Sequence, residues 1–344
     1  RELIECCWSS DPSARPLFRE IVETLSNDSR FITEKVDSKE FFDYIKFNFC
    51  SEKVDELNKF YESIQKVDIY QNRIKETAIK NISVNIKLID LNSFELKEQI
   101  GEGSYGTVYK VIEKASGDFC TAKISITKIN KSSEDKIANL EREVNIISKL
   151  DHPSILKFIG FNTYNFKHKK KPTIITEYVT NGSLDKIIEM ERKSLSNIDW
   201  DDTKKLITIY GIASGMSYLH SHEILHRDLK PGNILLDKYL FPKISDFGLS
   251  KELSEGSANH SGYKGTPAYS APEVFQEKYT KAGDVFSFAL IVYEIMTNEV
   301  LYSNMNQFQL LSKVCAGYRP SFRYPIASSY EELIKDCWKD DPKE

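Results

Sequence analysis

The sequence predicts an α+β protein in which a small β-rich lobe is followed by a larger helical lobe. Strand-like segments begin at Phe94 and continue through a glycine-rich turn to Val111. Helical patterns dominate after residue 180, and 40% of the 344 residues are hydrophobic, which suffices for a large core. We place the β-rich lobe at residues 91–179 and the helical lobe at residues 180–344, with a cleft between them.

Charge and hydropathy exclude several classes of protein. The chain has 47 basic and 51 acidic residues, so its net charge of −4 gives no reason to expect nucleic acid as the main partner. The longest strongly apolar stretch, Val285 to Met296, contains Ser287 and Glu294 and is shorter than the roughly 20 residues that span a bilayer. The six cysteines form no C-x-x-C pair, as is typical of buried thiols in the cytoplasm. We therefore expect a cytoplasmic protein without a membrane segment.

The two ends of the chain carry the same pattern. Residues 3–12 and 333–342 share Leu, Ile, Cys, Trp, Asp and Pro at a constant offset of 330 positions. Because Trp and Cys are rare, the match predicts two copies of one module in tandem. Residues 1–25 would then be the C-terminal end of a preceding module.

Residues 26–90 lie between the copies and are predicted to be a partly helical linker. An aromatic cluster occupies residues 41–45. Further on, apolar residues recur at spacings of three and four, at Val54, Leu57, Tyr61 and Ile64. This stripe favours a surface helix that packs on a neighbouring lobe, because a coiled coil needs more heptads.

A glycine-rich turn lies between the first two predicted strands, with glycines at positions 101, 103 and 106. A dinucleotide-binding fold would place a helix after such a turn, whereas here a strand follows. The turn is therefore the tip of a β-hairpin, whose glycines let backbone N–H groups approach an anion closely. Alone, the pattern also fits an ordinary hairpin.

Later motifs give this hairpin a context. Lys123 lies in a strand-like segment and Glu143 in a helical one, and a buried lysine that faces phosphates needs a carboxylate to hold it. Three further motifs follow in order: His226–Asn233, Asp246–Gly248 and Ala271–Glu273. This ordered set resembles the eukaryotic protein kinase family over residues 91–344, and it implies the two-lobed protein-kinase fold.

The resemblance implies phosphoryl transfer from ATP, which requires mainly positioning and charge neutralisation from the protein. Lys123 would hold the α- and β-phosphates while Glu143 orients it. Asp228 would accept the proton of the substrate hydroxyl, and Lys230 would neutralise the γ-phosphate.

The resemblance also implies a Mg²⁺ site and a nucleotide pocket. Asn233 and Asp246 would supply oxygen ligands to the cation. Thr176 resembles a small gatekeeper residue, so we expect an open pocket behind the adenine. The implied ATP-binding residues are Ile100, Gly101, Gly103, Gly106, Val108, Lys123, Thr176, Glu177, Val179, Leu235 and Asp246.

Other features resemble particular parts of the family. Lys230 and the segment 265–270 are similar to those of Ser/Thr kinases, whereas residues 182–184, Asp199-Trp200, His220 and the Cys337-Trp338 ending are similar to the tyrosine-kinase-like branch. Family features with supporting roles are an internal spine and a tether of the catalytic loop: Ile147, Phe158, His226 and Phe247 for the spine, and Asp284 for the tether.

Three functions remain open from the sequence: an active Ser/Thr protein kinase, a pseudokinase or scaffold that binds ATP or partners without turnover, and a small-molecule kinase. The complete catalytic set favours the first over the second. The long segment that ends in Ala271-Pro272-Glu273 argues against the third, since it shapes a platform for protein substrates.

Activation is expected to involve phosphorylation between Asp246 and Glu273, since Arg227 can pair with a loop phosphate. Ser261 is the favoured acceptor, for an upstream kinase or for autophosphorylation. Thr266 is instead expected to hydrogen-bond Asp228 and Lys230. The other candidate acceptors are Ser254, Ser257 and Tyr263.

The repeated ends raise a question about Glu273. In the family this glutamate pairs with an arginine of a Trp…Asp-Pro…Arg-Pro motif, which the first copy provides as Arg15. The equivalent position in the second copy is 345. Either Glu273 stays unpaired and partly solvated, or residues 11–25 fold back and supply Arg15. The fold-back would use an apolar helix face made of Leu17, Phe18, Ile21, Val22 and Leu25.

Overall fold

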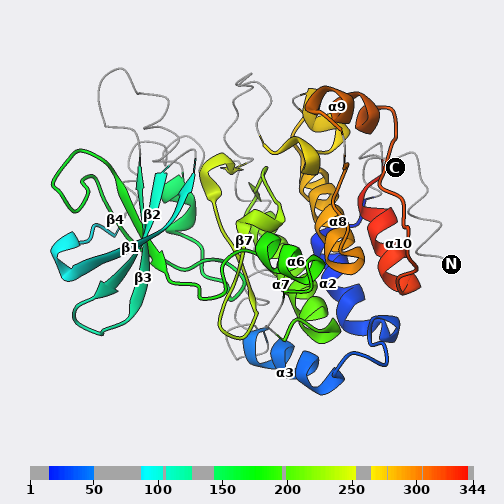
Figure 1. Ribbon diagram of the computed structural model, residues 1–344, viewed down its shortest axis with the longest axis horizontal. Helices are drawn as coiled ribbons and strands as arrows, with labels where there is room; N and C mark the ends of the chain where they lie inside the picture. The colour runs from blue at the N-terminus through cyan, green and yellow to red at the C-terminus, as the bar shows by residue number, and fades with distance from the viewer. Residues whose placement is uncertain are drawn as a thin grey trace, which may run out of the picture.

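The computed structural model describes residues 15–49, 87–103, 106–125, 143–195, 199–252, 265–276, 278–303 and 305–339. Figure 1 shows a β-sheet at one end of the molecule and a helical body at the other. The predicted α+β architecture with a β-rich lobe before a helical lobe is confirmed.

The N-lobe sheet has five antiparallel strands in the order β1-β2-β3-β5-β4. Strand β3 buries alternate residues, which is the pattern expected of a strand with one face on a core. A short 3₁₀ turn, η3 (Leu91–Ser93), precedes the sheet. The strands are β1 (Phe94–Gly103), β2 (Gly106–Glu113), β3 (Phe119–Ser125), β4 (Phe158–Asn162) and β5 (Thr173–Glu177).

The glycine-rich segment is a β-hairpin, as predicted. Gly101 pairs with Val108, and Gly103 pairs with Gly106, at the end of the β1–β2 ladder. A Cβ atom at Gly106 would lie 2.6 Å from the carbonyl oxygen of Ile124 on β3. Only glycine fits there, because the neighbouring backbone cannot move away cheaply.

The C-lobe is built on two central helices, α7 (Asp202–Ser221) and α8 (Lys281–Thr297). Asp201 caps α7, where its side chain accepts from the N–H of Lys204. The apolar stretch at 285–296 lies in α8, and nearly every residue of this helix is buried. Three outer helices complete the lobe: α6 (Leu184–Arg192), α9 (Gln307–Cys315) and α10 (Ser328–Cys337).

Short elements between these helices carry the motifs. The two small sheets pair β6 (Ile224–Leu225) with β9 (Lys251–Glu252), and β7 (Ile234–Leu236) with β8 (Pro242–Ile244). The 3₁₀ turns among the described residues of this region are η5 (Pro231–Asn233), η6 (Phe247–Leu249), η7 (Pro267–Tyr269) and η8 (Pro272–Gln276). The strands of the small sheets flank the loops that contain His226–Asn233 and Asp246–Gly248. This pairing holds the two loops side by side, so their polar side chains lie close together.

Residues 15–49 pack on the C-lobe, and we call them the N-terminal strap (Figure 1, blue). The strap contains α2 (Phe18–Asn27), η2 (Ser29–Phe31) and α3 (Ser38–Phe49). Arg15 Nη1 lies 2.6 Å from Glu273 Oε1, so the fold-back is the arrangement found, and Glu273 is not left unpaired.

The predicted apolar face of α2 is correct except at one position. Phe18, Ile21 and Leu25 are each 1% exposed, and Val22 packs partly buried against the core. Leu17 is 47% exposed, so its assignment to this face was wrong. It precedes the first helical residue and takes the N-cap position with extended backbone, which turns its side chain away from the face of the helix.

Some expectations lie outside the described residues: the first copy of the repeat at 3–12, the helical stripe at 54–64, and the candidate phosphorylation sites Ser254, Ser257, Ser261 and Tyr263. Within the described ranges, no helix is both long and apolar enough to cross a membrane.

Candidate active site

Lys123 on β3 contacts two carboxylates, one from its own lobe and one from the C-lobe. Its Nζ lies 2.7 Å from Glu143 Oε1 and 3.0 Å from Asp246 Oδ1. Residues 143–147 are helical, and Asp246 precedes η6 in the C-lobe. The three predicted residues therefore come together from a strand, a helix and a turn.

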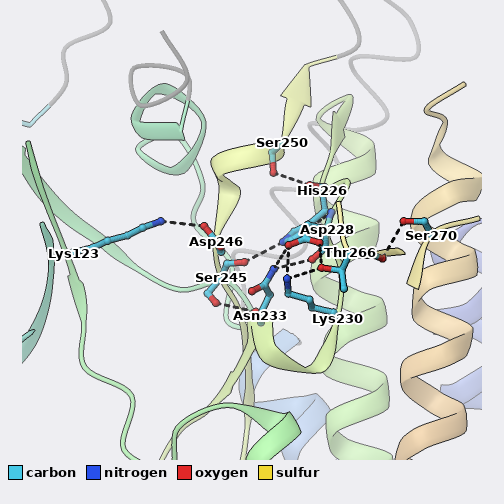
Figure 2. A network of polar contacts seen from close by, with 10 residues as sticks. All are labelled: Lys123, His226, Asp228, Lys230, Asn233, Ser245, Asp246, Ser250, Thr266 and Ser270. Carbon is cyan, nitrogen blue, oxygen red and sulfur yellow. Dashed lines mark hydrogen bonds and ion pairs between the residues drawn. The ribbon is translucent and has the colours of Figure 1, made fainter. Parts of the chain in front are cut away.

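The charges of this group stabilise one another. Burial alone would lower the pKa of Lys123, but Glu143 and Asp246 more than offset it and hold the pKa above the ordinary value. Burial would likewise raise the pKa of Asp246, and Lys123 reverses the direction, so the carboxyl stays ionised. Lys123 is a fixed cation, and its amine end points toward Asp246 (Figure 2).

Asp228 lies at the centre of a second polar cluster (Figure 2). Its Oδ2 accepts from Lys230 Nζ at 2.8 Å, and its Oδ1 accepts from Thr266 Oγ1 at 2.7 Å. Lys230 also donates to Thr266 Oγ1 at 2.7 Å, which closes a triangle. The predicted contacts of Thr266 are confirmed.

Asn233 joins this cluster through its amide nitrogen. Nδ2 donates to the carbonyl oxygen of Asp228 at 2.8 Å and to its Oδ2 at 3.1 Å. The backbone oxygen of Asn233 accepts from both the N–H and the hydroxyl of Ser245, the residue before Asp246. Ser245 thus connects the Asp228 loop to the Asp246 loop.

Asp284 on α8 holds the backbone of the catalytic loop, as the resemblance implied. Its Oδ2 accepts from the N–H of His226, and its Oδ1 accepts from the N–H of Arg227, both at 2.9 Å. Arg227 has a φ of +68°, a left-handed conformation that non-glycine residues rarely adopt. The paired hydrogen bonds compensate for this unfavourable backbone next to Asp228.

Side chains of the predicted spine are buried behind the loop. His226 is fully buried, and its ring centroid lies 5.5 Å from that of Phe247. Ile147 belongs to the same core, and Phe158 packs against it partly buried. These contacts connect the lobes through their hydrophobic interiors.

Most of the predicted nucleotide-binding residues lie on five strands: β1, β2, β3, β5 and β7. Val108 on β2 pairs with Lys123, and Thr121 on β3 pairs with Thr176 on β5. Thr176 is 7% exposed, while Ile100 on β1 is 41% exposed. Glu177 ends β5, with Val179 just beyond it, and Leu235 on β7 forms a bridge with Ser183.

One polar pair was missed from the sequence. Tyr269 Oη donates to Glu294 Oε2 at 2.6 Å, and this contact ties the loop that contains Thr266 to α8. Burial raises the pKa of Glu294 to about 7. The signal was present, because Glu294 is the one charged residue of the stretch 285–296 and needs a buried partner.

Comparisons with known proteins agree with this geometry. The family model for the protein kinase domain matches residues 94–344. "Probable serine/threonine-protein kinase drkC" of Dictyostelium discoideum is 35% identical over 268 residues, which cover 75% of this chain and 34% of the relative. From Arabidopsis thaliana, serine/threonine-protein kinase STY17 is 30% identical (74% of this chain, 42% of the relative). Serine/threonine-protein kinase CTR1 of the same plant is 31% identical (78% and 31%).

The chain spans between 31% and 42% of the length of these three relatives. The matched region contains both lobes, the Lys123 group and the Asp228 cluster. The chain therefore belongs to the protein kinase family.

Proposed function

We propose that this chain transfers the γ-phosphoryl group of ATP to serine or threonine hydroxyls of protein substrates. The observation that carries the proposal is the triangle of Asp228, Lys230 and Thr266 beside the group of Lys123, Glu143 and Asp246. The triangle holds a carboxylate and a cation together. The Lys123 group supplies the cation that phosphates require and the carboxylate that a metal requires.

Asp228 is the proposed acceptor of the proton from the substrate hydroxyl. Thr266, Lys230 and Asn233 together donate to both carboxylate oxygens, which fixes the orientation of the group. A positioned carboxylate that lies within hydrogen-bond reach of a hydroxyl contributes general-base catalysis. Lys230 adds a positive charge beside the site where negative charge develops during transfer.

Lys123 is the proposed phosphate ligand on the nucleotide side. Glu143 holds its amine end in the cleft, and the lysine remains charged because the pKa is raised. The hairpin glycines at 101, 103 and 106 would cover the phosphates. Val108, Leu235 and the segment from Thr176 to Val179 would surround the base.

Asn233 and Asp246 are the proposed Mg²⁺ ligands, and the donor set fits. Asn233 uses its amide nitrogen for Asp228, which leaves the amide oxygen for a cation. Asp246 offers an ionised carboxylate whose side chain is 34% exposed. Within the described ranges no three His, Cys, Asp or Glu side chains gather, so ATP oxygens would complete the coordination. When bound, the metal neutralises charge on the phosphates.

Phosphorylation of the activation segment is the proposed control, with Ser261 as the favoured acceptor. Arg227 supports it: its Nε is buried, has no hydrogen-bond partner in the described part of the chain, and can donate to a phosphate. Its guanidinium lies 3.8 Å from the ring centroid of Tyr279, which limits its freedom to move.

Two wider assignments are part of the proposal. The Lys230 and Thr266 contacts support a Ser/Thr kinase. Residues 182–184, Asp199-Trp200, His220 and Cys337-Trp338 support a place in the tyrosine-kinase-like branch. The repeated ends support a tandem arrangement, in which residues 1–25 are the C-terminal end of a preceding kinase-like module, residues 26–90 a partly helical linker and residues 91–344 the kinase domain. We place the protein in the cytoplasm, because its six cysteines form no C-x-x-C pair, as is typical of thiols in a reducing compartment.

The test is transfer of labelled phosphate from ATP and Mg²⁺ to a degenerate peptide library. The proposal predicts label on serine and threonine. Label on tyrosine alone would contradict the assigned acceptor, and binding of ATP without any transfer would favour a pseudokinase.

A further inference from the structure

The N-terminal strap contacts the helix that precedes the catalytic loop. Phe18 is 1% exposed, and its ring packs edge-on against His220 of α7, with the ring centroids 5.1 Å apart. The same ring contacts Phe288 of α8 at 5.3 Å. Phe18 therefore fills the space where the two central helices of the C-lobe meet.

His220 is the next contact toward the site. Its Nε2 lies 2.9 Å from Asp284 Oδ2, the oxygen that also accepts from the N–H of His226. Phe18, His220, Asp284 and the backbone before Asp228 thus form one continuous series of contacts. Every link except the first is a hydrogen bond.

The orientation of His220 depends on packing. Its Nδ1 is buried and finds no hydrogen-bond partner among the residues that the structure describes. Buried polar atoms in proteins generally have a hydrogen-bond partner, but in the described residues only the bond to Asp284 holds this ring. The ring of Phe18 therefore supplies the constraint that a second hydrogen bond would otherwise provide.

We propose that Phe18 is a positioning residue for the catalytic loop, acting through His220 and Asp284 from the strap of the same chain. It lies outside residues 94–344, which match the kinase family. The strap is then part of the catalytic unit rather than only an addition to its surface. This inference rests on the proposed role of Asp228.

The test compares Phe18→Ala with Phe31→Ala. Both residues lie in the strap and are 1% exposed, and the two substitutions remove the same atoms. Phe31, however, packs against Tyr330 of α10 and not against His220. Both variants are expected to lower the Tm, which controls for the stability of the strap. Phe18→Leu and Phe31→Leu repeat the comparison with smaller cavities if either alanine variant fails to fold.

Amide hydrogen exchange is the first readout. Phe18→Ala should selectively lose protection at His226 and Arg227, relative to amides of β2 and β3. Phe31→Ala should leave this ratio unchanged. Because exchange does not depend on phosphoryl transfer, the result separates this inference from the proposed function.

Steady-state kinetics is the second readout. Phe18→Ala should lower kcat by roughly tenfold to a hundredfold, the cost of a catalytic group misplaced by a distant change, with the KM for ATP unchanged. Phe18→Leu should restore part of kcat, whereas Phe31→Ala should retain nearly all of it. Equal effects of Phe18→Ala and Phe31→Ala on loop exchange and kcat would overturn the proposal. A strap exchanged between copies, seen as a dimer in sedimentation, would overturn its intrachain form.

Discussion

Arg15 and Glu273 form a buried ion pair across 258 positions of sequence, with Nη1 and Oε1 2.6 Å apart. The guanidinium also donates to the carbonyl oxygens of Ala282 and Lys339, and it lies 5.4 Å from the ring centroid of Phe286. One side chain therefore connects the strap, η8, α8 and the end of α10. The segment that ends in Glu273 is fixed by a residue from the other end of the chain.

Arg15→Ala should destabilise the protein strongly. The substitution leaves the Glu273 carboxylate buried and unpaired, which costs about 3–5 kcal/mol. Chemical denaturation measures the loss. Arg30→Ala is the control, because Arg30 is an exposed strap arginine whose pairs with Asp28 and Glu332 contribute about 1 kcal/mol or less. If Arg15→Ala and Arg30→Ala lower the free energy of unfolding equally, the buried pair does not contribute the stability assigned to it.

Thr266→Ala should lower kcat by about tenfold, the equivalent of one lost hydrogen bond in the Asp228 cluster. The hydroxyl donates to Asp228 and accepts from Lys230, so its loss frees both side chains. Thr266→Ser keeps the hydroxyl and should retain most of the rate. Steady-state kinetics with a peptide substrate decides; a serine variant as slow as the alanine variant would argue against the hydrogen-bonding role.

Thr176→Met should weaken bulky ATP-competitive inhibitors while the affinity for ATP stays similar. Thr176 is buried on β5 opposite Thr121, and the longer side chain would fill the space behind the proposed adenine site. Competition binding against a nucleotide analogue provides the measurement. If such inhibitors bind both forms equally, Thr176 does not line that space.

Much of this site could be predicted, because the residues of each motif are close together in the sequence and therefore lie close together in the structure. Asp228, Lys230 and Asn233 lie within one loop, so their proximity follows from local sequence. Lys123, Glu143 and Asp246 come from three elements, and their meeting was predictable only through the family resemblance. The hairpin followed from glycines between two strand patterns.

Other features depend on packing that sequence does not encode locally. The fold-back was one of two arrangements consistent with the sequence, because the choice between them depends on how well Phe18 and Ile21 fit the C-lobe. Leu17 was wrongly assigned to the buried face, since α2 begins at Phe18 and the residue before it has extended backbone. Likewise, the Tyr269–Glu294 pair joins a loop to a helix, and no pattern in either segment predicts the partner.

The stability of the protein should change with pH through Glu294. Burial raises the pKa of this carboxyl from its ordinary 4.5 to about 7. The groups that act on it are Tyr269, which donates a hydrogen bond, together with the charges of Arg192 and Asp185. Since the folded pKa is raised, the stabilisation is complete below about pH 4.5 and is lost as the pH rises through 7.

Glu294→Gln removes this titration. Relative to the unchanged protein, the variant should gain stability between pH 5 and pH 8, by about 3 kcal/mol at most from a shift of this size. Urea denaturation at several pH values measures the difference. Parallel stability curves for the two proteins would exclude Glu294 as the titrating group.

The central claim is that Asp228 acts on the acceptor hydroxyl in phosphoryl transfer, and the most direct measurement is kcat of Asp228→Asn with a serine-containing peptide. Asparagine has the same shape as aspartate, and its amide oxygen can still accept the hydrogen bond from Thr266. It cannot accept a proton as a carboxylate does. The account predicts a loss of about a hundredfold or more in kcat, the scale of a positioned base. ATP affinity should stay nearly unchanged, because Lys123 keeps its ion pairs with Glu143 and Asp246. Near-normal kcat in Asp228→Asn, with the variant folded and binding ATP, would contradict it.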